Sequence, residues 1–171
     1  MDYTFQFADA TVMQGRTVDV PLYLVESGTD NLNTIGLRSA GVQLTIGTPS
    51  ITTVSATTPN PAFDKTKVTT GTTPSVRESI KKVPPVTAPG DSRILIGDFT
   101  FRGLTIGSAP IAMSIPGGKA DNVLANGTII DSLITHQAAT LTVTAVPEPS
   151  AFLLTGLASI LLLLFGRRKR A

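Results

Sequence analysis

An alternation of apolar and polar residues in short runs constrains this chain more than any other feature. In residues 17–24, Val18, Val20, Leu22 and Leu24 alternate with polar or smaller side chains, so that one face is continuously aliphatic. Such period-two spacing is typical of a half-buried β-strand. Other runs share this spacing: Val42, Leu44 and Ile46; Ile94 and Ile96 with Phe99 and Phe101; Leu141 with Val143. No window among the first 146 residues sustains the 3.6-residue apolar period of a helix.

These strand-like runs predict an all-β domain. They are rich in Val, Ile, Thr and Phe and are separated by clusters of Gly, Pro, Asn and Ser. Parallel sheets need crossover helices, which the pattern lacks, so we expect an antiparallel sandwich of two sheets with about 8 or 9 strands. Residues 57–73 and 81–91, rich in Thr, Pro and Gly, interrupt the pattern and are expected to form long surface loops.

Composition and charge exclude several classes of protein. The 171 residues contain no Cys, which rules out disulfides, zinc–thiolate sites and cysteine nucleophiles. Of the 14 Lys and Arg residues, four lie in the last five positions, and the remaining ten face eleven acidic residues before Pro147. The body is therefore almost neutral and lacks the clustered cations that bind a phosphate backbone, so we expect no nucleic-acid partner.

The last 25 residues differ sharply from the rest. Between residues 151 and 165, 12 of 15 side chains are apolar, and the run ends in a cationic cluster of Arg167, Arg168, Lys169 and Arg170. A helix over residues 151–166 would be roughly 24 Å long, slightly less than the hydrocarbon core of a bilayer. It would be apolar on every face, unlike a core helix, so we expect a membrane span. The four cations would stop it and stay in the cytoplasm, which predicts that the body is exported.

The order of features in residues 147–171 resembles the PEP-CTERM sorting signal of Gram-negative bacteria that produce exopolysaccharides. Pro147, Glu148 and Pro149 precede the apolar segment, and the cationic cluster follows it. The resemblance implies that a membrane-embedded exosortase recognises these three residues and processes the chain for display or release at the cell surface. It divides the chain into a body, residues 1–146, and a sorting signal, residues 147–171.

The beginning of the chain lacks the export signal that such proteins carry. Residues 1–10 have neither a cationic region nor a continuous apolar run, and they are expected to form a strand. Either the reading frame starts upstream, or export depends on the tail alone. The first explanation is favoured, and it predicts an upstream extension of about 15 to 30 residues.

The order of segments in the body resembles the cohesin-like sandwich, which is of the jelly-roll type. These segments carry the resemblance: GRTVDVPLYL at 15–24, the strand pair and Asn-Pro-x-Phe element within 36–64, RILIGDFTF at 93–101, SAPIAMSI at 108–115 and ATLTVT at 139–144. Cohesins bind dockerin modules, often on a sheet face. The resemblance is a pattern of strands, so it implies a fold and assigns no binding residue.

Candidate catalytic groups are sparse. The lone His136 follows Asp131 and Ser132, but the sequence has no nucleophile elbow or oxyanion loop, so a surface His beside a strand is favoured. A glycosidase needs two carboxylates across a cleft. Asp91 and Asp98 bracket one predicted strand, and at opposite ends of it they would be ~23 Å apart.

Structural calcium is the only cofactor that the sequence leaves open. Asp30, Asn31 and Asn33 form one group of oxygen ligands, and Asp121 with Asn122 forms another. Neither matches the spacing of an EF-hand loop, so we expect no cofactor.

The leading hypothesis is a non-enzymatic protein of the cell surface or extracellular matrix, sorted by exosortase, whose body binds exopolysaccharide or another surface protein. Two alternatives remain open. The body could be an enzyme acting on matrix polysaccharides through an unrecognised site, or the chain could be a single-pass membrane protein that is never processed.

Overall fold

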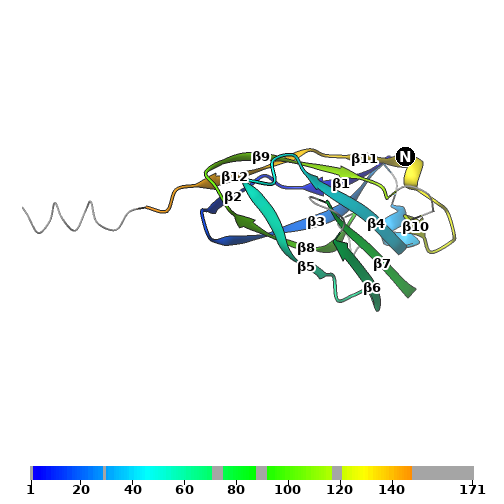
Figure 1. The fold of residues 1–171 in the computed structure, drawn as a ribbon. Helices are drawn as coiled ribbons and strands as arrows, with labels where there is room; N and C mark the ends of the chain where they lie inside the picture. Colours follow the sequence, from blue (N-terminus) through cyan, green and yellow to red (C-terminus); the bar gives the residue numbers. More distant parts are fainter. Residues whose placement is uncertain (1, 29, 71–74, 88–91, 117–120, 148–171) are drawn as a thin grey trace, which may run out of the picture.

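The alternating segments form the strands of a β-sandwich in a computed structural model, which describes residues 2–28, 30–70, 75–87, 92–116 and 121–147 (Figure 1). The first predicted strand, residues 17–24, lies within β3, Thr17–Ser27. The runs at Val42 and Ile94 lie within β4, Leu37–Ile46, and β8, Arg93–Gly103. The all-β prediction and the two-sheet sandwich are confirmed.

The first sheet, called sheet A here, has the strand order β11-β1-β3-β8-β5. Its strands are β1 Asp2–Phe7, β3, β5 Thr52–Pro59, β8 and β11 Ile134–His136. The expectation that residues 1–10 form a strand is confirmed by β1.

The second sheet, sheet B, has the order β2-β12-β9-β4-β7-β6, with β10 added beside β4. Its strands are β2 Ala10–Met13, β4, β6 Lys65–Thr70, β7 Ser75–Val86, β9 Gly107–Ser114, β10 Val123–Leu124 and β12 Ala139–Thr144. The described part thus has twelve strands, more than the eight or nine expected, because the first strand is divided between the sheets and β10 and β11 are very short.

The predicted antiparallel arrangement is wrong, because both sheets are mixed. β1 pairs with β11 in parallel, and β2 pairs with β12 in parallel. Crossover helices are needed where parallel strands follow one another closely in the chain. In this fold the parallel partners come from opposite ends of the domain, and most of the sandwich connects them.

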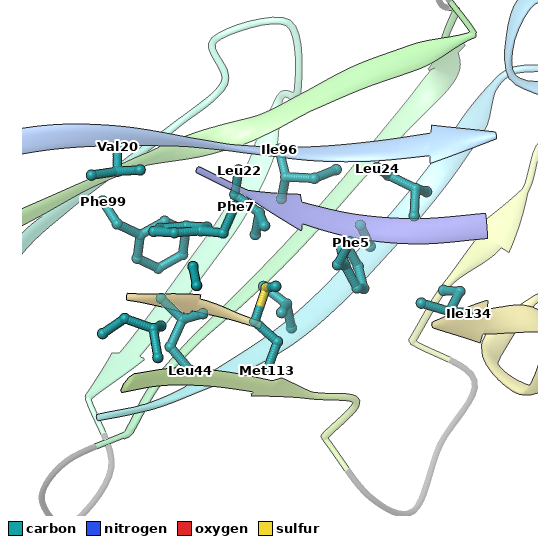
Figure 2. Close-up of a cluster of buried hydrophobic side chains, with 14 of the residues drawn as sticks. Phe5, Phe7, Val20, Leu22, Leu24, Leu44, Ile96, Phe99, Met113 and Ile134 are labelled. Carbon is teal, nitrogen blue, oxygen red and sulfur yellow. The ribbon is translucent and has the colours of Figure 1, made fainter. Parts of the chain in front are cut away.

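The core lies between the sheets and contains a cluster of three aromatic rings. The Phe7 ring lies 5.7 Å from the rings of both Phe99 and Phe101, in edge-on geometries of 63° and 86°. Figure 2 shows Phe7 and Phe99 of sheet A facing Leu44 and Met113 of sheet B. Alternate residues of β1 and β3 enter this core, and β8 follows the same alternation on each side of a register shift at Ile96 and Gly97, so the intervening residues form the outer face of sheet A.

The two long loops expected from composition are partly strands. β5 and β6 occupy much of residues 57–73, and β7 extends through Pro84 and Pro85 to Val86. Proline cannot donate a ladder hydrogen bond, so a strand tolerates it where one edge is unpaired. β6 pairs with β7 only as far as Lys81, and this leaves the two prolines beyond the end of that pairing.

The helices of the described residues are short: α1, Asn31–Thr34, and the 3-10 turn η1, Asp131–Leu133. None of them is long and apolar enough to cross a bilayer. The expected fold class, which ended in a C-terminal hydrophobic helix, is therefore not what the described chain shows. The segment assigned to that helix, residues 151–166, lies outside the described residues.

Candidate binding site

The outer face of sheet A carries one large aromatic residue. In β3, Val20, Leu22 and Leu24 point into the core, so Tyr23 points outward and is only partly covered. Strand pairing places Tyr23 opposite Leu95 of β8. An aromatic ring fixed on a rigid sheet is a suitable element for a binding surface, because little conformational entropy is lost when a partner covers it.

Arg93, the first residue of β8, packs on this ring. Its guanidinium carbon lies 5.0 Å from the centre of the Tyr23 ring, a cation–π contact. Arg93 pairs with Val25 in the ladder, so it is a diagonal neighbour of Tyr23 on the same face. The pair, Tyr23 with Arg93, combines a broad apolar surface with a fixed positive charge.

Two hollows adjoin this pair, and both include Tyr23 and Arg93 in their walls. The larger has a volume of about 380 Å³ and is completed by the chain around Asn60, Val86 and Leu95. The smaller, about 300 Å³, lies toward β1, and Gln6, Pro21 and Gln137 complete it. We call these two hollows and the Tyr23–Arg93 pair between them the sheet A site.

The edges of the sheet A site are built from constrained backbone. The Asn60 side chain donates to the carbonyl of Leu95 at 2.7 Å and accepts from the amide of Ala62 at 2.9 Å, which holds the turn after β5 against β8. Ser92, directly before Arg93, has φ +49°, the one left-handed conformation of a non-glycine residue in the described chain. Strained backbone of this kind is concentrated at binding sites, where surrounding contacts hold it in place.

The groups that the sequence suggested for catalysis do not come together. His136 in β11 stacks on the Phe5 ring with 6.0 Å between ring centres, and burial lowers the pKa of its imidazole below the ordinary value of 6.5. The carboxylate of Asp131 bonds elsewhere, to the chain at Asn122. Asp98 lies in β8 opposite Pro21, whereas Asp91 lies outside the described residues.

One of the two groups considered as calcium ligands, Asp121 with Asn122, is part of a buried hydrogen-bond network that we call the Asn122 network. Asp131 accepts hydrogen bonds from the backbone amides of Asp121 and Asn122 and from the Asn122 side chain, at 3.2, 2.9 and 2.7 Å. Asn122 is fully buried and bonds both the amide and the carbonyl of Gly41, at 3.0 and 3.3 Å. The side chain of Asn122 thereby fills the interval along β4 between its pairing with β9 and its pairing with β10.

The other group surrounds α1. Asn33 donates to the Asp30 carboxylate at 3.1 Å, and Asn31 donates to the Tyr3 hydroxyl at 3.3 Å. The buried Glu26 accepts from the Leu32 amide at 2.8 Å. Burial raises the pKa of the Tyr3 hydroxyl, and the nearby Glu26 carboxylate raises it further. Within the described residues no set of three or more acidic or His side chains is arranged to hold a metal ion.

The predicted sorting motif lies at the boundary of the described chain. Pro147 is described and exposed. Glu148 and Pro149 lie outside the described residues, as does the cationic cluster of Arg167, Arg168, Lys169 and Arg170.

The sequence alone does not reveal the sheet A site. The outward position of Tyr23 follows from the alternation in residues 17–24, which is a usable signal. Arg93 reaches it from a strand about 70 residues later in the chain, and only the register of β3 against β8 brings the two together. That register is a property of the whole sheet.

Solved structures with a similar fold include cohesins. A chain from the complex of the sixth cohesin of scaffoldin B of Acetivibrio cellulolyticus with a dockerin matches with TM-score 0.62 and 12% identity, over 84% of this chain and 100% of that one. A chain from a type I cohesin–dockerin complex of Clostridium thermocellum matches with TM-score 0.65 and 8% identity, over 84% and 100%. A non-cellulosomal cohesin from the archaeon Archaeoglobus fulgidus matches with TM-score 0.57 and 11% identity, over 84% and 92%.

No protein-family model and no curated protein matches the sequence. At such low identities the structural likeness concerns the fold alone. The body of this chain is therefore a cohesin-like β-sandwich.

Proposed function

We propose that this chain is a non-catalytic protein-binding module that is displayed at, or released from, the cell surface. The observation that carries the proposal is the cohesin-like fold, which extends over 84% of the chain and matches chains of cohesin–dockerin complexes. In those complexes a sandwich of this architecture acts as a scaffold for recognition. The same use of the fold is consistent with a body that carries two hollows on its surface beside Tyr23 and Arg93.

The sheet A site is the binding surface that the geometry favours. Tyr and Arg are the residue types most often responsible for binding energy at protein interfaces, and here they touch one another beside two hollows. The outer face of β9 on sheet B instead presents small side chains: Ser108, Pro110, Ala112 and Ser114. Such a face offers no anchor that could insert into a partner.

The tail would deliver the body to its place of action. Pro147, Glu148 and Pro149 form the recognition motif in this proposal, and exosortase is the processing enzyme. The apolar segment after them would insert in the inner membrane, and the cluster from Arg167 to Arg170 would remain in the cytoplasm. The body would then fold on the outer side, before or after it is separated from the tail.

Carbohydrate binding is a second candidate function for the same surface. Gln6 and Gln137 adjoin the Tyr23 ring in the smaller hollow. An aromatic ring beside amide side chains can accommodate the apolar face and the hydroxyl groups of a sugar. The partner would then be the exopolysaccharide.

Site-specific photo-crosslinking in an exosortase-producing Gram-negative host distinguishes these candidates. A photoreactive amino acid replaces the exposed Gln6 in the full chain, and a matched variant carries it at Ser114 on sheet B. We expect Gln6 to capture a protein of discrete mass, and we expect Tyr23→Ala or Arg93→Gln to abolish that product. Capture of polysaccharide at Gln6 would select the second candidate.

Capture of a discrete protein only from Ser114 would show protein binding by the wrong face. Absence of any product from both positions, with the chain folded and exported, would contradict binding altogether.

A further inference from the structure

One end of the sandwich carries exposed apolar side chains where the chain leaves the body. Ile106 is 56% exposed, Val146 49%, Met13 45% and Leu104 38%. They come from the last position of β2, the β8–β9 turn and the segment after β12. We call this surface, defined by these four residues, the exit end.

Strand pairing and hydrogen bonds hold these segments together. Met13 lies opposite Thr144 of β12, and Gly107, next to Ile106, lies opposite Val143. The Gln14 side chain donates to the Leu104 carbonyl at 2.9 Å. The exit end is therefore a fixed part of the fold, and its apolar side chains are presented together.

Two cations accompany the apolar residues. Arg16 lies in the β2–β3 turn, and Arg102 lies near the end of β8, opposite Thr17. Both side chains are exposed. The acidic residue nearest along these strands, Asp19, accepts a hydrogen bond from the Thr100 hydroxyl at 2.6 Å. Apolar side chains with neighbouring Arg residues match the interfacial region of an anionic bilayer.

The course of the chain specifies the occupant of this surface. β12 ends at the exit end, opposite the end that holds β10 and the N-terminus (Figure 1). Only four residues separate Val146 from the apolar run that begins at Ala151. Fully extended, that linker would place the exit end within about 17 Å of an inserted tail. The exit end is therefore the end of the body that is held next to the membrane.

We propose that the exit end docks on the surface of an anionic phospholipid bilayer while the tail is inserted. The inference rests on the membrane role proposed for the tail. Docking buries Met13, Leu104, Ile106 and Val146 in the interfacial layer, and Arg16 and Arg102 contact lipid phosphates. The long axis of the sandwich then stands away from the bilayer, and Pro147 is held at the depth of the headgroups, where a membrane-embedded protease can reach it.

Because the chain has no Cys, a single introduced Cys can carry an environment-sensitive fluorophore. The full chain is reconstituted in vesicles of phosphatidylcholine and phosphatidylglycerol with nitroxide-labelled lipid. Ile106→Cys reports on the exit end, and Ile129→Cys is its matched control: Ile129 has the same 56% exposure and lies in the loop after β10 at the opposite end. Leu161→Cys reports on the tail.

We expect the label at Ile106 to shift its emission to the blue and to lose emission to the nitroxide, while the label at Ile129 does neither. Replacing Arg16 and Arg102 with Gln should reduce the loss at Ile106. A water-exposed label at Ile106 together with a quenched label at Leu161 would refute docking and leave the tail proposal intact. An unquenched label at Leu161 would refute insertion of the tail itself. A blue-shifted label at Ile106 in lipid-free buffer would mean that the tail covers the exit end, which also overturns the inference.

Discussion

A few buried polar side chains bind the backbone of this sandwich at places where no neighbouring strand does so. Asn122 substitutes a side-chain amide for a missing strand beside Gly41, and Asp131 orients that amide. Glu26 binds the backbone at α1 in the same way. Such residues matter because a buried polar group that loses its partner costs more than the bond itself contributes. These positions should therefore be the most sensitive polar sites in the body.

Asn122→Ala should lower the free energy of unfolding by about 1–3 kcal/mol, because the amide and carbonyl of Gly41 and the carboxylate of Asp131 lose buried partners. Asn126→Ala is the control: Asn126 is exposed and accepts one hydrogen bond, from the Thr128 amide at 3.0 Å. It should cost about 0.5 kcal/mol. Urea unfolding measures the loss of stability in both variants. Equal losses would show that the hydrogen bonds of Asn122 do not stabilise the fold.

His136 should make stability depend on pH. Burial lowers the pKa of its imidazole in the folded state below 6.5, so the unfolded chain takes up the proton first as the pH falls. This contribution to stability is therefore complete above pH 6.5 and is lost as the pH decreases from 6.5 to the folded-state pKa. His136→Gln should remove that part of the slope. Urea midpoints between pH 8 and 5 test it, and parallel curves for the two proteins would contradict it.

The first strand explains why the sandwich closes. It passes from sheet A, as β1, to sheet B, as β2, and in each sheet it pairs in parallel with a strand from the end of the body. The backbone amide of Thr140 donates to Asp9, between the two halves, at 2.7 Å. The first strand therefore joins both sheets and links the beginning of the body to its last two strands. Its core residues should contribute strongly to stability.

Phe7→Ala should lower the free energy of unfolding by about 3–5 kcal/mol, because the ring of Phe7 fills the space against Phe99 and Phe101. Gln6 is the matched control in the same strand, since it points to the outer face and is exposed. Gln6→Ala should change stability by no more than about 0.5 kcal/mol. Urea unfolding of the two variants tests this prediction. A small loss of unfolding free energy for Phe7→Ala would mean that β1 is not part of the cooperative core.

Strands can be predicted from the sequence where apolar and polar residues alternate clearly. They cannot be predicted where the pairing with a distant strand determines the structure. The sequence predicts β3 and β8 because apolar side chains alternate along most of each strand. Residues 81–86 were expected to be a loop, since the local effect of Pro84 and Pro85 does not reveal that β7 is unpaired on one side at that point. The parallel pairs and the sheet A site depend on contacts between segments far apart in the chain, and no local pattern encodes them.

At the scale of the whole molecule, the described part of the chain has two different ends and a hollowed face on sheet A. The exit end presents apolar residues and leads to the proposed sorting signal, whereas the outer face of sheet A presents Tyr23 and Arg93 beside two hollows. A body attached at the exit end would keep this face directed sideways from the membrane. The central claim is therefore that the sandwich acts as a binding module outside the cytoplasm, after delivery by its tail.

Intact-mass measurement of the chain in each cellular fraction of an exosortase-producing host tests this claim most directly. We predict that the extracellular or surface fraction contains a folded body cut near Pro147, which lacks Arg167 to Arg170. When the exosortase gene is deleted, the intact chain should accumulate in the membrane fraction. Recovery of the uncut chain from the cytosol of both strains, when it is expressed from its native gene with any upstream sequence, would contradict the account.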